Sequence, residues 1–342
     1  MTRSFICSLG AAAWLFSTLA FGSDAPAKTG QLSGGLRYEI PASFRESFLE
    51  MAEDTEEAAQ AGKHVLLFMH LDECPYCGHM LEESFVSSDY AAWIPEHFDS
   101  IAVNIKGARE IAFNTELTVT EKELAEALKV RYTPTIVFLD GDNQPVLRTN
   151  GYRTASEFKH ILNFVNSKAY QSSDLTSYLA KVKQQRKPRY AFLPNRHFSA
   201  ITDLSRTADK PVMVIFEDPH CEQCAGFQRD LQHIKIDPLL EKFTVVRVDA
   251  NSITPIITPA GKSTTAVAWA RTLKLDYRPG VVLFDGGDEI MRIDGMLRLW
   301  HLNVALRYMG GRHYIQYPTM LDYGRVLRQT TLSAGVNIDY WE

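Results

Sequence analysis

Two Cys-x-x-Cys pairs, at 74–77 and 221–224, constrain the fold of this chain more than any other sequence feature. They lie 147 residues apart (221 − 74 = 147). Each pair follows an uninterrupted apolar run, 65–69 before the first pair and 212–216 before the second. A short apolar run that ends in a turn is typical of a fully buried strand. The sequence therefore predicts the same unit twice: a buried strand, a cysteine pair and a helix.

The elements that follow each cysteine pair also repeat in the same order. Both halves continue with a strand, a helix, an X-Pro step leading into a strand, a hairpin turn and a final helix. This shared order indicates an internal duplication. For the first half we expect an amphipathic stretch at 44–61, strands at 65–69, 101–105 and 135–139, a turn at 140–143 and helices at 121–129 and 156–165. For the second we expect strands at 212–216, 245–248 and 281–284, a turn at 285–288 and helices at 265–273 and 300–308.

Cysteine pairs in this setting can perform thiol–disulfide exchange. At a helix N-terminus, unpaired backbone N–H groups and the helix dipole favour negative charge, which lowers a thiol pKa. Cys74 and Cys221, each predicted to open its helix, are therefore the candidate attacking thiols. Cys77 and Cys224 lie one turn further on and are the candidate resolving thiols, which displace a bound substrate by exchange.

A proline precedes a predicted strand in each half. Thr133-Pro134 and Arg278-Pro279 both occupy this place, and the two prolines lie 145 residues apart (279 − 134 = 145). Proline can hold a cis peptide bond, which is otherwise rare. Such a bond beside the cysteines would present backbone groups to an extended substrate.

Together these motifs resemble the thioredoxin superfamily. The resemblance rests on the Cys-Pro-Tyr-Cys segment 74–77, the Thr-Pro-Thr segment 133–135 and the Phe-Leu-Asp-Gly segment 138–141. With the tail from 314 to Tyr323, it extends to the SoxW-type periplasmic thioredoxins. It implies an α/β fold of two tandem thioredoxin-like domains, each a central mixed sheet flanked by helices. It further implies periplasmic dithiol–disulfide exchange with protein substrates, often powered by a membrane electron donor of the DsbD or CcdA type. The expected substrate-binding residues are Pro75, Tyr76, Thr133, Pro134, Arg278 and Pro279.

The chain differs from thioredoxin at the position of the acidic residue that takes part in proton transfer. Thioredoxin has a buried Asp six residues before its first cysteine, and the residues at that place here are Phe68 and Ile215. In the second pair, Glu222 disfavours a thiolate and Arg278 favours one, so the net effect stays open. The acidic residues that could take over proton transfer are Asp72, Glu73, Glu217 and Glu222.

The N-terminal residues are typical of an export signal. Arg3 precedes an uncharged, largely apolar run at 4–23 that ends in small residues, so we expect a signal peptide at 1–22. The alternative is an uncleaved membrane anchor, because the run is nearly long enough to span a bilayer. We then expect a linker at 23–40, a first domain at 41–185 and a second at 186–342.

Composition and spacing argue against other classes of function. The formal charge of −5 does not suggest a nucleic-acid-binding protein, which needs a basic face. Zinc sites of four cysteines place their pairs much closer in sequence, and haem attachment needs a histidine where Gly78 and Ala225 stand. We therefore expect neither a metal nor a cofactor.

The sequence favours a reductase of protein disulfides and leaves two alternatives open. An oxidase or isomerase would use the same cysteines, because direction depends on reduction potential. A non-catalytic scaffold or chaperone for exported proteins would keep its disulfides locked. The second pair, 221–224, could relay electrons to the first domain, or it could be only a structural disulfide within an otherwise active protein.

Overall fold

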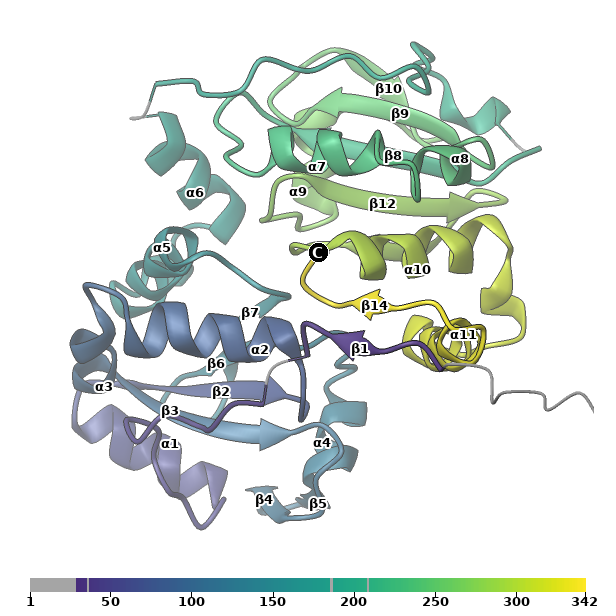
Figure 1. The fold of residues 1–342 in the computed structure, drawn as a ribbon. Helices are drawn as coiled ribbons and strands as arrows, with labels where there is room; N and C mark the ends of the chain where they lie inside the picture. Colours follow the sequence, from purple (N-terminus) through teal and green to yellow (C-terminus); the bar gives the residue numbers. More distant parts are fainter. Residues whose placement is uncertain (1–28, 36, 185–186, 208) are drawn as a thin grey trace, which may run out of the picture.

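The computed structural model of the chain describes residues 29–35, 37–184, 187–207 and 209–342 (Figure 1). The predicted signal peptide at 1–22 and the first residues of the predicted linker lie outside the described residues.

The first domain is built on a four-stranded mixed sheet in the order β3-β2-β6-β7. The central strand β2 pairs in parallel with β3 and antiparallel with β6, and β6 pairs antiparallel with β7. All seven residues of β2 are buried, which explains why the sequence shows an uninterrupted apolar run rather than alternation. The strands are β2 (His64–His70), β3 (Phe98–Asn104), β6 (Thr135–Leu139) and β7 (Pro145–Asn150).

Helices cover both faces of this sheet. Capping boxes at Thr120 and Thr154 begin α4 and α5, because each threonine side chain accepts the amide three residues on and a glutamate returns the contact. A hairpin that the sequence did not predict, β4 (Glu110–Asn114) with β5 (Leu117–Thr120), precedes α4. The helices are α1 (Met51–Gln60), α2 (Pro75–Met80) with a π-helical continuation (Leu81–Val86), α3 (Ile94–His97), α4 (Glu121–Ala127), α5 (Ala155–Asn166) and α6 (Leu175–Gln184).

The second domain repeats this architecture and confirms the predicted duplication. Its sheet has the order β13-β12-β8-β9, again with one parallel and two antiparallel pairings. The strands are β8 (Val212–Glu217), β9 (Thr244–Asp249), β12 (Gly280–Asp285) and β13 (Asp288–Ile293), with a small hairpin of β10 (Pro255–Ile257) and β11 (Ser263–Thr265). The helices are α7 (Cys224–Leu231), α8 (Asp237–Leu240), α9 (Ala266–Thr272), α10 (Leu299–Gly310) and α11 (Met320–Ser333).

Each sheet divides its domain into two apolar layers. Leu66 and Phe68 of β2 belong to one core cluster, whereas Val65 and Leu67 belong to another. This division follows from strand geometry, because successive side chains point to opposite faces of a sheet. The second domain shows the same alternation along β8.

The two domains pack through equivalent parts of their sheets. Gly151 follows β7 and Gly295 follows β13, and a Cβ on Gly151 would lie 3.0 Å from the Gly295 Cα. Only glycine at both places allows this approach. Beside it, the buried Arg153 pairs with Asp276 of the second domain at 2.9 Å, and the Tyr132 hydroxyl donates to the Arg292 carbonyl at 2.9 Å.

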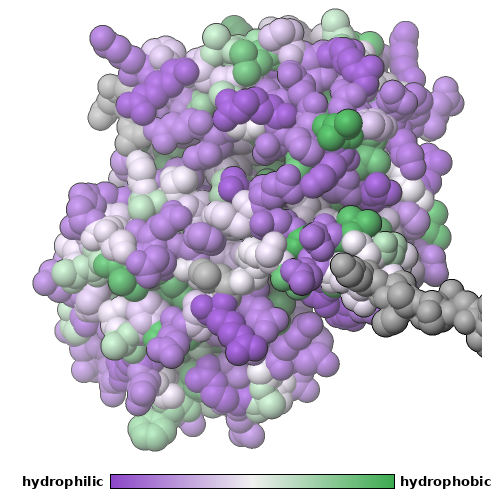
Figure 2. Space-filling model, in the orientation of Figure 1, coloured by the Kyte–Doolittle hydropathy of each residue, from purple (hydrophilic) through white to green (hydrophobic). Residues whose placement is uncertain are grey.

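The two ends of the described chain meet beside this domain contact. Strand β1 (Leu32–Ser33) pairs in parallel with β14 (Ile338–Asp339), next to α10 and α11 (Figure 1). Hydrophilic residues predominate on the face shown in Figure 2, with hydrophobic residues in small groups. Within the described ranges, no helix combines the length and apolar character needed to cross a bilayer.

Candidate functional site

Cys74 lies at the N-terminus of α2, as predicted. It is the N-cap residue, and its Sγ accepts the Cys77 backbone N–H at 3.2 Å. Cys74 and Cys77 form a disulfide with 5.3 Å between their Cα atoms. In the reduced protein the same amide and the helix dipole would stabilise a Cys74 thiolate.

The X-Pro loop lies against Cys74. The Thr133–Pro134 peptide bond is cis, and so is Arg278–Pro279 in the second domain. The Thr133 hydroxyl donates to the Cys74 Sγ at 3.3 Å, and the Thr133 carbonyl oxygen lies 3.7 Å from the same sulfur. The structure therefore brings together the cysteine pair and the loop, which are 59 residues apart in sequence.

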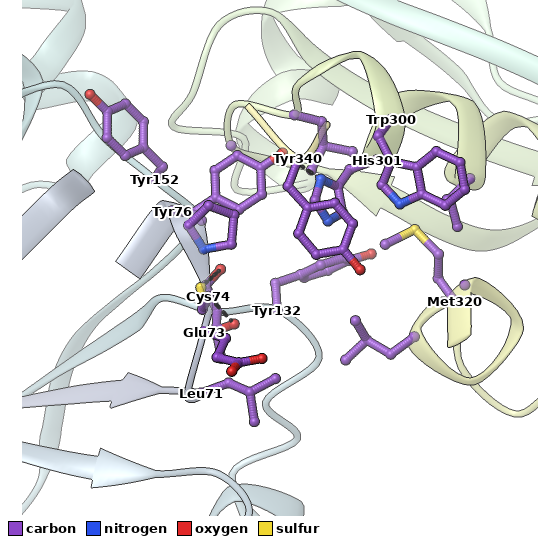
Figure 3. Close-up of a pocket in the computed structure, with 18 of the residues that line it drawn as sticks. Leu71, Glu73, Cys74, Tyr76, Tyr132, Tyr152, Trp300, His301, Met320 and Tyr340 are labelled. Atoms are coloured by element: carbon purple, nitrogen blue, oxygen red, sulfur yellow. Dashed lines mark hydrogen bonds between the residues drawn. The ribbon is translucent and has the colours of Figure 1, made fainter. Parts of the chain in front are cut away.

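A cavity of about 480 Å³ opens at Cys74, between the two domains (Figure 3). Pro75, Tyr76 and Thr133 line it as well, whereas Cys77 and Pro134 do not. The opposite wall comes from the second domain: Trp300 and His301 of α10, Met320 of α11 and Tyr340 near the chain's end. Cys74 thus faces a space that its own domain only half encloses.

Tyr76 connects the two domains at the edge of this cavity. Its hydroxyl lies 3.0 Å from the His301 Nδ1 and accepts the Arg298 backbone N–H at 2.8 Å. Desolvation lowers the pKa of His301 to about 4, so its ring is neutral near pH 7 and Nδ1 can accept the tyrosine proton. Burial raises the pKa of Tyr76, which keeps the phenol protonated. Tyr76, which the sequence predicts to bind substrate, therefore also connects the first domain to the second.

Trp341 packs on the outer side of α2. Its ring stacks on His79 at 3.7 Å between centroids and meets Tyr76 edge-on at 5.5 Å. The Arg298 guanidinium lies over the Trp341 ring at 4.9 Å. Sequence reasoning missed Trp341 and His301, because each lies more than 200 residues from the cysteine pair and belongs to no local motif.

The second cysteine pair has a different local structure. Helix α7 begins at Cys224, so the prediction that Cys221 opens this helix was wrong. Cys221 and Cys224 form a disulfide and are 3% and 0% exposed. Neither lines the large cavity; Pro279 lines a smaller one of about 70 Å³.

The chain between the domains covers this second pair. Tyr190 packs against both cysteines, together with Phe192. The Tyr190 hydroxyl donates to the buried Glu217 carboxylate at 2.9 Å, and its backbone N–H donates to the Pro219 carbonyl at 3.1 Å. Tyr190 and Phe192 thus cover part of the surface of the second pair.

Charged residues near the second cysteine pair lie beside residues of opposite charge. Arg278 is buried with its Nε 3.5 Å from Asp218, and its guanidinium donates to the Leu275 and Tyr277 carbonyls. Burial lowers the pKa of Arg278. Glu222 lies 3.7 Å from Arg189.

Of the acidic residues considered for proton transfer, only Glu217 is buried. Burial raises its pKa, and it also accepts from the Gln228 side chain at 2.7 Å. In the first domain, Glu73 is largely exposed and faces Arg37 at 3.9 Å, and Asp72 accepts from Asn104 at 3.1 Å. In the described parts of the chain, no three His, Cys, Asp or Glu side chains gather in a way that could hold a metal ion.

A four-stranded mixed sheet with a Cys-x-x-Cys motif and a cis-proline loop, present twice, defines a tandem thioredoxin-like protein. The sequence profile described as Thioredoxin-like domain matches residues 51–166 and 199–310, which together make up well over half of the chain. The chain belongs to this family. No curated protein matches it.

Several solved structures are similar to parts of the chain. A thioredoxin-fold protein from Helicobacter pylori is 24% identical, with 40% of this chain and 92% of that chain covered and a TM-score of 0.32. A thioredoxin from Thermus thermophilus is 27% identical over 38% of this chain and 87% of that chain, with a TM-score of 0.26. The first two thioredoxin domains of Saccharomyces cerevisiae Eps1p are 15% identical over 72% of this chain and 89% of that chain, also with a TM-score of 0.26.

Proposed function

We propose that this protein is an exported thiol–disulfide oxidoreductase that reduces protein disulfides through Cys74 and Cys77. The observation that carries the proposal is the surroundings of Cys74. Its Sγ accepts a helix N-terminal amide, touches the cis-proline loop and borders an open cavity. A site that only holds the fold together needs no such access.

The reaction is an exchange of two electrons between dithiol and disulfide. The Cys74 thiolate attacks one sulfur of the substrate disulfide, and the other substrate sulfur leaves as a thiolate. The Cys77 thiolate then attacks the Cys74 sulfur and releases the second substrate thiol. The product is the Cys74–Cys77 disulfide, which an external dithiol must reduce again.

The proposal is tested by replacing the attacking sulfur. Cys74→Ser should abolish insulin reduction coupled to dithiothreitol, because no thiolate remains to attack. The matched control is the double variant Cys221→Ser, Cys224→Ser, which should retain most of the activity. Undiminished turnover by Cys74→Ser would refute the assignment.

The reduction potential of the cysteine pair decides whether the protein reduces or oxidises its substrates. A reduction potential of the Cys74–Cys77 pair near that of thioredoxin, roughly −270 mV, would support a reductase. A value near that of a strong oxidant, roughly −120 mV, would support the oxidase or isomerase alternative.

For the second pair we propose a structural role. Both pairs are buried, with Cys74 7% and Cys221 3% exposed, so the distinguishing observations are that Tyr190 covers the second pair and that neither Cys221 nor Cys224 lines the cavity. They support a disulfide that stabilises the second domain and does not exchange with substrate. Thiol labelling after mild reduction tests this: Cys74 and Cys77 should react, and Cys221 and Cys224 should not.

The signal-like N-terminus supports export to the periplasm, with a role like that of SoxW-type thioredoxins and a membrane dithiol donor of the DsbD or CcdA type. Fractionation of cells that produce the full chain tests the location. Trapping mixed disulfides in membranes with a Cys77→Ser variant tests the donor.

A further inference from the structure

We infer that the cavity between the domains is the substrate site of Cys74 and that the second domain selects the substrate: a short, extended, cysteine-bearing peptide segment with apolar residues and carboxylates beside the cysteine. This inference rests on the proposed function. Its distinct content is that selection belongs to the second domain and follows charge.

The first step concerns size. The cavity of about 480 Å³ lies within the range of roughly 300–1,000 Å³ that is usual for ligand pockets. A folded protein cannot enter such a space, whereas a few residues of an extended chain can. The substrate must therefore offer its disulfide on a flexible segment or a free peptide.

The second step concerns the rigidity of the wall. Three contacts hold the second domain against the first around the cavity: the buried Arg153–Asp276 pair, the close backbone approach at Gly151 and the Tyr76 hydroxyl bonded to α10. These contacts hold the wall that faces Cys74 against the first domain.

The third step concerns the apolar part of the lining. Trp300, Met320 and Tyr340 face the cavity across from Cys74, and Tyr132 lies between them (Figure 3). Aromatic and thioether side chains bind apolar side chains without a fixed hydrogen-bonding pattern. They therefore suit apolar residues next to the substrate cysteine.

The fourth step concerns charge. The lining includes five Lys or Arg residues and three Asp or Glu residues. Desolvation and the neighbouring Asp276 raise the pKa of one of these acids, Asp294, to about 8, so it carries little charge near pH 7. Lys106 and Arg328 form no ion pair with any residue that the structure describes. Arg37, Arg292 and Arg325 are already paired with Glu73, Glu289 and Asp322, so the positive charge left at the rim is that of Lys106 and Arg328, and it favours a substrate with carboxylates.

The test compares two short peptides that differ only in charge. Each carries one cysteine, activated as a mixed disulfide with thionitrobenzoate, flanked by apolar residues and by either Asp or Lys. The reduced full-length Cys77→Ser variant forms a stable mixed disulfide through Cys74 and releases the coloured thionitrobenzoate anion. Subtracting the rate with Cys74→Ser isolates the reaction at Cys74.

The acidic peptide should react faster, by about two- to fivefold for each charge that a rim cation engages. Arg328→Glu, on the wall that the second domain supplies, should reduce or reverse this preference, and Lys106→Glu, in the first domain, should reduce it less. Lys262→Glu makes the same charge change at an exposed residue outside the cavity and should leave the preference unchanged. Added salt should weaken the preference, because exposed charges are screened.

Reaction with hydroxyethyl disulfide, which is small and neutral, distinguishes a failure of the proposed function from a failure of the inference about substrate selection. If Cys74 fails to react with it, the proposed function itself fails. If Cys74 reacts with it but treats both peptides alike, or if Lys262→Glu acts as strongly as Arg328→Glu, only the inference about selection is overturned.

Discussion

At the scale of single residues, the two cysteine pairs differ in the atoms around the first sulfur. Cys74 receives an amide N–H and a threonine hydroxyl and borders a cavity. Cys221 stands three residues before its helix and lies under Tyr190. An attacking thiolate needs stabilisation and access. Among the residues that the structure describes, Cys74 has both a stabilising amide and a bordering cavity, whereas Cys221 lines neither cavity described above.

Tyr190 is the residue whose removal should expose the second pair. In Tyr190→Ala, Cys221 and Cys224 should become reducible by mild reductant, which thiol labelling measures. The free energy of unfolding should fall by about 3–5 kcal/mol, as for other buried aromatic-to-alanine changes. The control Tyr190→Phe keeps the ring but leaves Glu217 without its hydroxyl partner, so it should cost about 1–3 kcal/mol without exposing the cysteines. Equal labelling of Tyr190→Ala and the wild type would contradict this view.

At the scale of elements, the strand pair β1–β14 positions Trp341 on α2. The Asp339 carboxylate accepts the Trp341 backbone N–H at 2.7 Å, and the ring covers His79. Elements from opposite ends of the chain thereby cover the helix that carries the first cysteine pair.

Removing the Trp341 ring should change the titration of His79. Desolvation is the main cause that lowers the pKa of His79. Trp341→Ala exposes the imidazole to water, so its pKa should rise toward the ordinary value of about 6.5, which an NMR titration measures. Trp93→Ala, which removes a ring stacked on the distant His97, should not affect His79. An unchanged pKa in Trp341→Ala would argue against the stack.

At the scale of the whole molecule, a buried ion pair holds the domains together. Arg153 is 2% exposed, bonds Asp276 at 2.9 Å and lies 4.8 Å from the Tyr277 ring centroid. Arg153→Met should lower the free energy of unfolding by about 3–5 kcal/mol, because it leaves a buried carboxylate without its partner. Urea denaturation measures this loss. A variant as stable as the wild type would mean that the pair does not join the domains.

The acid beside this pair should make stability depend on pH. The folded state raises the pKa of Asp294 to about 8, above the unfolded value of about 3.9. Between these values the folded state binds the extra proton, so this contribution is complete below pH 4 and is lost as pH rises toward 8. The free energy of unfolding of Asp294→Asn should therefore decline less between pH 5 and pH 8 than that of the wild type. Urea titration at each pH measures this difference. A parallel decline in both proteins would rule this out.

The sequence by itself determined the two thioredoxin-like sheets, the place of Cys74 at the start of its helix and the two X-Pro loops, because apolar runs, helix caps and X-Pro steps act over a few residues. The hairpins β4–β5 and β10–β11 were not anticipated, since strands of three to five residues carry little periodic signal. Only the tertiary structure decided that Cys74 borders a cavity and that Tyr190 covers the second pair. That difference arises from contacts across more than 200 residues at Tyr76 and from the packing of Tyr190, which no local pattern encodes.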